Sequence, residues 1–267
     1  MANLLIANAG AWQPTADEFR EALNHLHGED AVRCAIETAC ASQLHPGALN
    51  KARLLARHLL LCELINSRDT QGKYRLRKRE VRLPVSAYGK PLTASYGDGN
   101  YSVTHVAEWV CCACSSAPLG VDLVAVYPQD EALSSYFLSK EELAQIEVVP
   151  RQQWASLFAL IWSLKECVLK VIGLGLSKKL KMRDIFLDRV GLENLFVVSN
   201  AVPGSLYTVP KHRLMVSLQG NTKHPWVCSS LMLPGTPPHI LSVVLQEGVV
   251  KGDIEVMFVS PETALHD

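Results

Sequence analysis

The chain has 267 residues and an even balance of charge, with 26 Lys and Arg against 26 Asp and Glu. This balance excludes a uniformly basic or uniformly acidic protein, so electrostatic recognition must come from local clusters. Hydrophobic residues make up 48% of the chain, which permits a sizeable core and excludes disorder of the whole chain. The length fits one large domain or two small ones.

Eight cysteines are present, three of them within the segment 111–114. A disulfide framework is typical of short secreted chains, and the first residues lack the basic and long apolar segments of a signal peptide. A metal site would need a second Cys/His pair at ligand spacing, which the sequence does not provide. We therefore expect buried reduced thiols and a cytoplasmic protein. No apolar run reaches the roughly 18 residues that a membrane span needs.

The first part of the chain predicts helices followed by strands. Thr15 and Glu18 have the spacing of a capping box and predict that a helix begins there. Apolar residues at helical spacing predict a second helix over 49–65. Strand patterns then cover 73–84, 101–105 and 109–115.

The second part repeats this order. A turn predicted at 118–120 is followed by an apolar strand over 121–126, and Ser139 with Glu142 forms a second capping-box pattern. A long helix is predicted over 151–172 and ends at glycines. Further strands are predicted over 195–198, 214–218, 226–233, 240–245 and 254–259.

Helices followed by strands, twice over, predict an α+β chain rather than a doubly wound βαβ fold. We expect two similar α+β halves, residues 1–117 and residues 118–267, with a seam near Pro118. No sequence repeat is visible between them, so the expected similarity is one of fold.

The most informative segment is Trp162-Ser-Leu-Lys165-Glu166-Cys-Val-Leu-Lys170. Its Trp162, Glu166 and Lys170 are each four residues apart and share one face of the predicted long helix. A carboxylate between an aromatic ring and an ammonium group can bind a cation, accept a proton or form a plain surface ion pair. The spacing alone leaves these three interpretations open.

Other polar residues stand in predicted strands. Asp122 lies in an otherwise apolar strand, where burial is costly unless the carboxylate is paired or holds a metal. Capping of a loop at the strand end is the alternative for this residue. Ser102, Thr104 and His105 bring hydroxyl and imidazole groups to the end of another strand, and both groups are suited to phosphate oxygens.

Taken in order, these segments resemble the 4′-phosphopantetheinyl transferase superfamily. Its pattern is Gly-Lys-Pro, then (Asn/Ser)-(Val/Ile)-(Ser/Thr)-His, then Gly-(Ile/Val)-Asp, then Trp-x-x-Lys-Glu-x-x-x-Lys. The chain matches it at 89–91, 102–105, 120–122 and 162–170. The length is similar to that of the two-half type, named for surfactin synthetase and aminoadipate-semialdehyde dehydrogenase. This type implies a pseudo-two-fold fold with the active site at the seam.

The resemblance implies transfer of the 4′-phosphopantetheine group from coenzyme A to a serine of an apo carrier protein, with release of 3′,5′-ADP. Such a holo-[acyl-carrier-protein] synthase would hold Mg²⁺ on Asp122 and Glu166. Glu166 would act as the base, and Lys170 would contact the transferring phosphate. The implied contacts with coenzyme A are Arg53, Gly89, Lys90, Ser102, Thr104, His105 and Lys165. Trp162 is expected to anchor the helix rather than to contact a ligand.

The chain departs from the superfamily pattern at one metal-binding position. Many members carry Glu two residues after the Asp, where this chain has Val124. In this respect it is more similar to eukaryotic members, which have an apolar residue there and fill the vacated position with water. Because Mg²⁺ keeps waters readily, two carboxylates and pyrophosphate oxygens still complete a site.

The predicted partners are coenzyme A and an acidic apo carrier protein, with neither a membrane nor a nucleic acid, and a monomer is expected. A basic stretch over 68–90 fits coenzyme A phosphates and an acidic carrier helix. Nucleic-acid binding would be expected to bring RNP-like aromatics or a zinc-finger pattern as well, and neither is present.

Two alternatives stay open. One is a coenzyme A-binding relative that has lost turnover, which only Val124 favours. The other is a Mg²⁺-dependent phosphohydrolase that uses the same carboxylates with water as the nucleophile, although this class typically has more acidic ligands.

Overall fold

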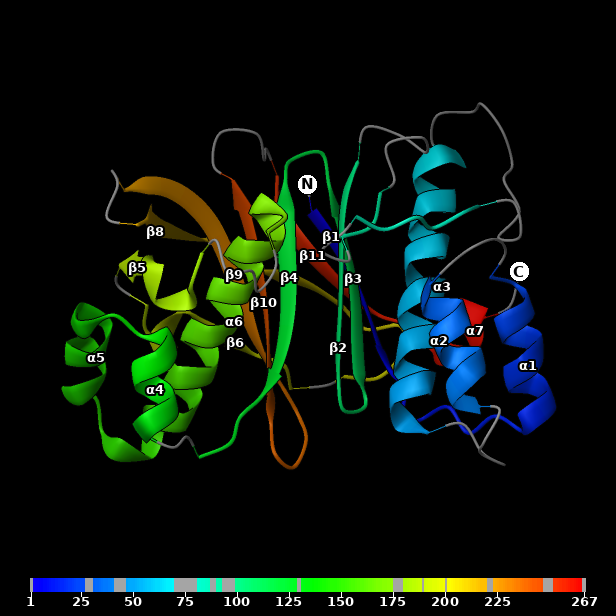
Figure 1. Cartoon of the computed structure of the whole chain (residues 1–267), viewed down its shortest axis with the longest axis horizontal. Helices are drawn as coiled ribbons and strands as arrows, with labels where there is room; N and C mark the ends of the chain where they lie inside the picture. Colours follow the sequence, from blue (N-terminus) through cyan, green and yellow to red (C-terminus); the bar gives the residue numbers. More distant parts are fainter. Residues whose placement is uncertain are drawn as a thin grey trace.

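The structure is a computed structural model, and the part of the chain that it describes is given by the following ranges. They are 2–26, 31–40, 47–69, 81–86, 90–92, 99–128, 131–174, 180–188, 190–199, 201–219, 223–246 and 252–265, with the backbone alone at 40, 67–69 and 131–133. The elements stack in four layers: helices, a sheet, a second sheet and further helices (Figure 1).

The first sheet has the strand order β2-β3-β1-β11-β7. Its strands are β1 (Ala2–Asn8), β2 (Asn100–Val106), β3 (Trp109–Ser115), β7 (Leu206–Val209) and β11 (Ile254–Phe258). In the centre, β1 pairs antiparallel with β3 and parallel with β11. The outer face is covered by α1 (Ala16–Asn24), α2 (Ala31–Cys40), α3 (Ala48–Asp69) and α7 (Pro261–Leu265).

The second sheet has the order β4-β10-β9-β8-β5, and β6 pairs with β9. Its strands are β4 (Leu119–Ala125), β5 (Ile185–Asp188), β6 (Leu195–Val197), β8 (His212–Leu218), β9 (His224–Leu233) and β10 (His239–Gln246). The long helix α6 (Trp154–Ile172) packs on the outer face. Beside it are α4 (Glu131–Phe137), α5 (Lys140–Glu147) and the short 3₁₀ helices η3 (Arg151–Gln153), η4 (Met182–Asp184) and η5 (Leu192–Asn194).

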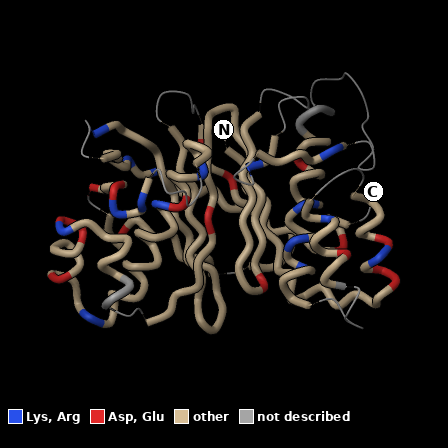
Figure 2. The backbone as a smooth tube through the Cα atoms, in the orientation of Figure 1, with Lys and Arg blue, Asp and Glu red and all other residues tan. Residues whose placement is uncertain are grey.

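The alternation of side chains along β4 decides where its carboxylate points. Leu119, Val121 and Leu123 belong to the core between the two sheets. Side chains alternate between the faces of a strand, so Asp122 and Val124 point to the opposite side, toward α6. Val124 indeed packs against the core cluster that α6 forms with the second sheet. Most charged residues lie on the helices and loops rather than along the central strands (Figure 2), so a carboxylate on β4 is exceptional.

The predicted α+β class is confirmed, and so are both capping boxes. Thr15 and Ser139 each accept a hydrogen bond from the backbone of the Glu three residues later, whose side chain bonds back. The predicted long helix is η3 followed by α6, which ends at Gly173 with φ 74°. The strands predicted at 101–105, 109–115, 121–126, 195–198, 214–218, 226–233, 240–245 and 254–259 correspond to β2, β3, β4, β6, β8, β9, β10 and β11.

Other local predictions were wrong or incomplete. The turn predicted at 118–120 does not exist, because Leu119 and Gly120 already belong to β4. In the predicted strand over 73–84, residues 73–80 lie outside the described residues, and residues 81–84 form no strand. Sequence patterns missed the shorter or end-of-chain elements, namely α2, α4, α7, β1, β5 and β7.

Segments from late in the chain complete the first sheet. Both β7 and β11 follow residue 118, yet they pair with each other and β11 pairs with β1. The division into halves at residue 118 stays a prediction.

None of the cysteines whose side chains the structure describes forms a disulfide. Cys111, Cys112, Cys167 and Cys228 are buried, as predicted, whereas Cys34 is exposed and Cys62 and Cys114 are partly buried. Burial raises the pKa of the Cys111 and Cys112 thiols, so they stay protonated and inert. None of the described helices combines the length and the apolarity required to cross a membrane.

Candidate active site where α6 meets β4

Helix α6 lies directly against β4, and Gly120 makes this approach possible. A Cβ atom at Gly120 would lie 2.1 Å from the backbone oxygen of Cys167 and 3.0 Å from Cβ of Lys170. At 2.1 Å the two atoms would collide, and because the oxygen belongs to the backbone, no side-chain movement could relieve the collision. Glycine is needed here for its lack of a side chain, and the contact brings the last turns of α6 next to Asp122.

An ion pair joins the two elements. Lys170 Nζ donates to Asp122 Oδ1 at 2.8 Å and to the Val121 backbone oxygen at 2.7 Å. Burial raises the pKa of Asp122, and the ammonium beside it limits the rise. For Lys170, burial acts to lower the pKa, but the charge of Asp122, the hydrogen bond to it and the other negative groups nearby together outweigh burial, and the pKa is raised. Lys170 is therefore a charged group held at the edge of the core.

Glu166 lies one helical turn before Lys170. Burial first, and then the negative charge of Asp122, raise the pKa of Glu166 to about 7. Among the described residues its carboxylate makes no hydrogen bond or salt bridge, so its oxygens are available to a ligand. A carboxylate that titrates near neutral pH is suited to accept a proton.

The pair Asp122 and Glu166 has the donor chemistry that Mg²⁺ prefers. Mg²⁺ takes oxygen ligands and usually keeps several waters, so one or two carboxylates suffice. Each carboxylate raises the energy of the other, and a divalent cation between them would remove that repulsion. Among the described residues, no set of three or more His, Cys, Asp or Glu side chains is placed to hold a metal. Val124, half-buried on the same face as Asp122, is the apolar member of this site.

A second cluster is cationic and joins β2 to α3. His105 is half-buried, and its pKa is lowered by burial and then by the charges of Arg53, Lys170 and Arg57. The sequence predicted Arg53 and His105, and the structure brings them together. The sequence analysis did not identify Arg57. Its position four residues after Arg53, on the same helix face, could have indicated it. Positive charges gathered around a half-buried imidazole are complementary to an anion.

Comparison with known proteins finds relatives that match the segment containing β4 and α6. The sequence profile described as "4'-phosphopantetheinyl transferase superfamily" matches residues 118–224, which contain β4 and α6. The chain is 29% identical over 136 residues to the 4′-phosphopantetheinyl transferase Sfp of Bacillus subtilis, a match that covers 51% of this chain and 61% of the relative. These matches support the resemblance to the 4′-phosphopantetheinyl transferase superfamily that the sequence pattern indicated.

Other relatives within the superfamily support the predicted two-half type. The chain is 26% identical to the 4′-phosphopantetheinyl transferase psf-1 of Bacillus pumilus over 55% of this chain and 64% of the relative. It is 28% identical to the L-aminoadipate-semialdehyde dehydrogenase-phosphopantetheinyl transferase of Candida glabrata over 45% of this chain and 49% of the relative. In each of these comparisons, less than two thirds of the relative is matched.

The lysine of the superfamily's Trp-x-x-Lys-Glu pattern requires a correction. Lys165 was predicted to contact coenzyme A, but its side chain is fully buried. Its ammonium group donates to Glu142 Oε2 at 2.6 Å, to the Phe137 oxygen at 2.8 Å and to the Met182 oxygen at 3.2 Å. All three protons are therefore used within the protein. Lys165 points away from the Glu166 face and stabilises the packing of α6 against α4, α5 and η4.

The lysine of the Gly-Lys-Pro pattern lies at the end of α6. Lys90 Nζ donates to the Val171 backbone oxygen at 3.3 Å, a favourable position for a cation because the last carbonyls of a helix carry partial negative charge. Burial lowers the pKa of Lys90. Gly89 lies outside the described residues, and contact of either residue with coenzyme A stays a prediction.

Trp162, the aromatic residue of the Trp-x-x-Lys-Glu pattern, anchors α6 to the core, as predicted. The Trp162 ring packs edge-on against Phe137 at a centroid distance of 5.1 Å and joins the core beneath α6. No contact with ligand is needed to explain it.

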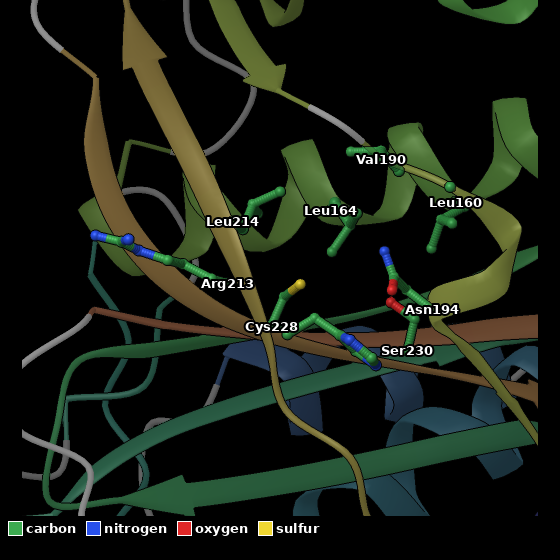
Figure 3. Close-up of a pocket in the computed structure, with 10 residues that line it drawn as sticks. Leu160, Leu164, Val190, Asn194, Arg213, Leu214, Cys228 and Ser230 are labelled. Atoms are coloured by element: carbon green, nitrogen blue, oxygen red, sulfur yellow. The ribbon is translucent and has the colours of Figure 1, made fainter.

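A small pocket lies on another face of α6, and none of the predicted site residues lines it. Figure 3 shows Leu160 and Leu164 of α6 facing Cys228 and Ser230 of β9 across it. Its volume of about 20 Å³ has room for roughly one water molecule. A pocket of this size is too small to hold a substrate.

Proposed function

We propose that the chain transfers the 4′-phosphopantetheine group of coenzyme A to a serine of an apo carrier protein and releases 3′,5′-ADP. The observation that carries this proposal is the cluster of Asp122, Glu166 and Lys170 at the contact of α6 with β4. It joins two segments of the superfamily pattern that are far apart in the sequence. The activity would be that of a holo-[acyl-carrier-protein] synthase in the broad sense, with the carrier class open.

The reaction forms a bond between the serine oxygen and the β-phosphorus of coenzyme A, and it breaks the bond from that phosphorus to the bridging oxygen. Asp122 and Glu166 would hold Mg²⁺, which when bound would neutralise charge on the pyrophosphate. Glu166 would also be the base that accepts the proton of the serine hydroxyl, directly or through a water. Lys170 would stabilise negative charge on the transferring phosphate, because its ammonium stays charged beside Asp122.

The nucleotide end of coenzyme A would lie at the cationic cluster. His105 and Arg53 would hold the 3′-phosphate, and Arg57 adds a third positive charge near the same imidazole. By the resemblance, Lys90 and the backbone of Gly89 would also contact coenzyme A. Because this phosphate is far from the reacting phosphorus, its contacts would contribute binding that is equal in the ground state and the transition state.

The remaining features of the proposal concern the setting of the enzyme. The active site would lie at the seam between residues 1–117 and residues 118–267. The second substrate would be an acidic carrier protein, and the chain would act as a monomer in the cytoplasm.

A transfer assay with fluorescent coenzyme A tests the proposal. Apo carriers of the fatty-acid, polyketide, peptide-synthetase and aminoadipate types would each be incubated with the protein and Mg²⁺. We expect fluorescence to become covalently attached to at least one carrier only when Mg²⁺ is present. Phosphopantetheine released without a carrier would instead indicate a phosphohydrolase. Coenzyme A binding without either reaction would indicate a relative that has lost turnover.

A further inference from the structure

Strands β2 and β4 lie side by side but belong to different sheets, each as an edge strand. Two side chains join them. Ser102 Oγ accepts a hydrogen bond from the Val121 amide at 3.1 Å, and Thr104 Oγ1 accepts one from the Leu123 amide at 3.2 Å. Both hydroxyl side chains are buried. The sequence predicted them as phosphate contacts, whereas these bonds are to the protein backbone.

The spacing of these bonds fixes the position of β4 along β2. The hydroxyls are two residues apart on β2, and the amides that they bind are two residues apart on β4. The amides lie immediately before and after Asp122, on the edge of β4 that β10 does not cover. A buried amide without an acceptor costs about 1–3 kcal/mol, so any sliding of β4 would be opposed at both points.

We propose that Ser102 and Thr104 are positioning residues that hold Asp122 under α6. They act through the backbone of β4, which they bind on both sides of the carboxylate. With β4 held in this register, Asp122 meets Lys170 at 2.8 Å and stays near Glu166. The role of Asp122 as a metal ligand belongs to the proposed function, and this inference rests on it.

The two positions also restrict the residue type. Each position requires a short side chain with an acceptor oxygen, which Ser and Thr both supply. Their direct neighbour His105 belongs to the cationic cluster. The same two bonds therefore set the distance between the proposed nucleotide end and the proposed reacting end of the site.

The test uses variants that remove one acceptor at a time. Thr104→Val keeps the shape and loses the oxygen, and Thr104→Ser is the conservative rescue. Ser102→Ala removes the other acceptor. Ser115→Ala is a matched control, because Ser115 Oγ is buried at the C-terminal end of β3 and accepts from the Ala117 amide at 3.1 Å rather than from an amide of β4. Thermal unfolding reports whether each variant is folded.

Two measurements on the full chain then decide the matter, and neither uses transfer activity. Amide hydrogen exchange is followed by NMR, and Mn²⁺ affinity is followed by electron paramagnetic resonance with Mn²⁺ alone as the probe. We expect Thr104→Val to speed exchange of the Leu123 amide about tenfold and to weaken Mn²⁺ binding by roughly three- to tenfold, in keeping with the loss of one buried hydrogen bond. Ser102→Ala should do the same with the Val121 amide, and Thr104→Ser should resemble wild type. Ser115→Ala should affect only the Ala117 amide.

Each contrary result has a defined meaning. Unchanged exchange at Leu123 and Val121 would overturn the positioning role, and so would faster exchange with unchanged Mn²⁺ affinity. A variant that loses coenzyme A affinity but keeps Mn²⁺ affinity would show that the hydroxyl is a ligand contact instead. Wild-type protein that binds no Mn²⁺ would refute the metal site of the proposed function itself, which separates the two failures. If Thr104→Val does not fold, Ser102→Ala carries the same test.

Discussion

Glu166→Gln is the most informative single substitution, because it removes a charge and a proton acceptor while keeping the shape of the side chain. In the metal-free folded protein the pKa of Glu166 is about 7, compared with 4.5 for an ordinary glutamate. The folded chain thus binds this proton more tightly than the unfolded chain does. The free energy of unfolding must therefore fall as the pH rises from 4.5 to 7, and the penalty is complete above that range. Gln carries no such penalty.

The size of the effect follows from the shift. The difference between a pKa of about 7 and one of 4.5 corresponds to about 3 kcal/mol at 1.36 kcal/mol per unit. Because Glu166 is only half-buried, solvent screening reduces this free energy, and we expect the shift to lower the free energy of unfolding by about 1–2 kcal/mol. Metal-free Glu166→Gln protein should therefore be more stable than wild type by this amount at pH 8 and nearly equal to it at pH 5.

Urea unfolding followed by tryptophan fluorescence, with a chelator present, measures both differences. Adding Mg²⁺ at pH 8 should stabilise wild type and leave the variant unchanged, and the variant should have lost transfer activity. The reasoning is refuted if the stability difference is the same at pH 5 and pH 8. Near-wild-type turnover with normal Mg²⁺ dependence would equally exclude Glu166 as ligand and base.

Four further substitutions test the other parts of the site. Asp122→Ala should abolish transfer, and excess Mg²⁺ in a titration should not restore it. His105→Ala should raise the KM for coenzyme A more than it lowers kcat; if wild type and variant discriminate equally against dephospho-coenzyme A, His105 does not touch the 3′-phosphate. Val124→Glu should keep activity and lower the Mg²⁺ concentration for half-maximal rate, since Val124 shares the face of Asp122, whereas insoluble protein would show a purely structural position. Lys165→Met should cost about 3–5 kcal/mol in urea unfolding by leaving a buried carboxylate unpaired, and an unchanged midpoint would contradict the buried ion pair.

The sequence predicted the residues of the Asp122, Glu166 and Lys170 cluster because the spacings that show them are local to single elements. A four-residue spacing is enough to put Glu166 and Lys170 on one helix face, and a two-residue spacing puts Asp122 and Val124 on one strand face. That these two faces meet was implied only by the resemblance. The structure supplies the physical cause, which is the missing side chain at Gly120.

The contacts that the sequence did not predict are made with distant partners. Lys165 is adjacent to Glu166, but its partner Glu142 is 23 residues away, and no local pattern shows that the two meet. Contact of Ser102 and Thr104 with a phosphate stays a prediction, but the bonds that their hydroxyls accept from β4, 19 residues away, were not predicted. Gly120 was interpreted as a turn residue, because the sequence alone does not distinguish a glycine needed for close packing from one needed for a turn.

Intact mass spectrometry of an apo carrier protein tests the central claim most directly. The carrier would be incubated with coenzyme A, Mg²⁺ and either wild-type protein or its Glu166→Gln variant, and a carrier whose acceptor serine is alanine would serve as control. We predict that wild type adds the mass of one phosphopantetheine group to the apo carrier, and that neither the variant nor the serine-free carrier gives this product. A panel of apo carriers that all keep their mass, with folded wild-type protein that binds coenzyme A, would contradict the proposed transfer.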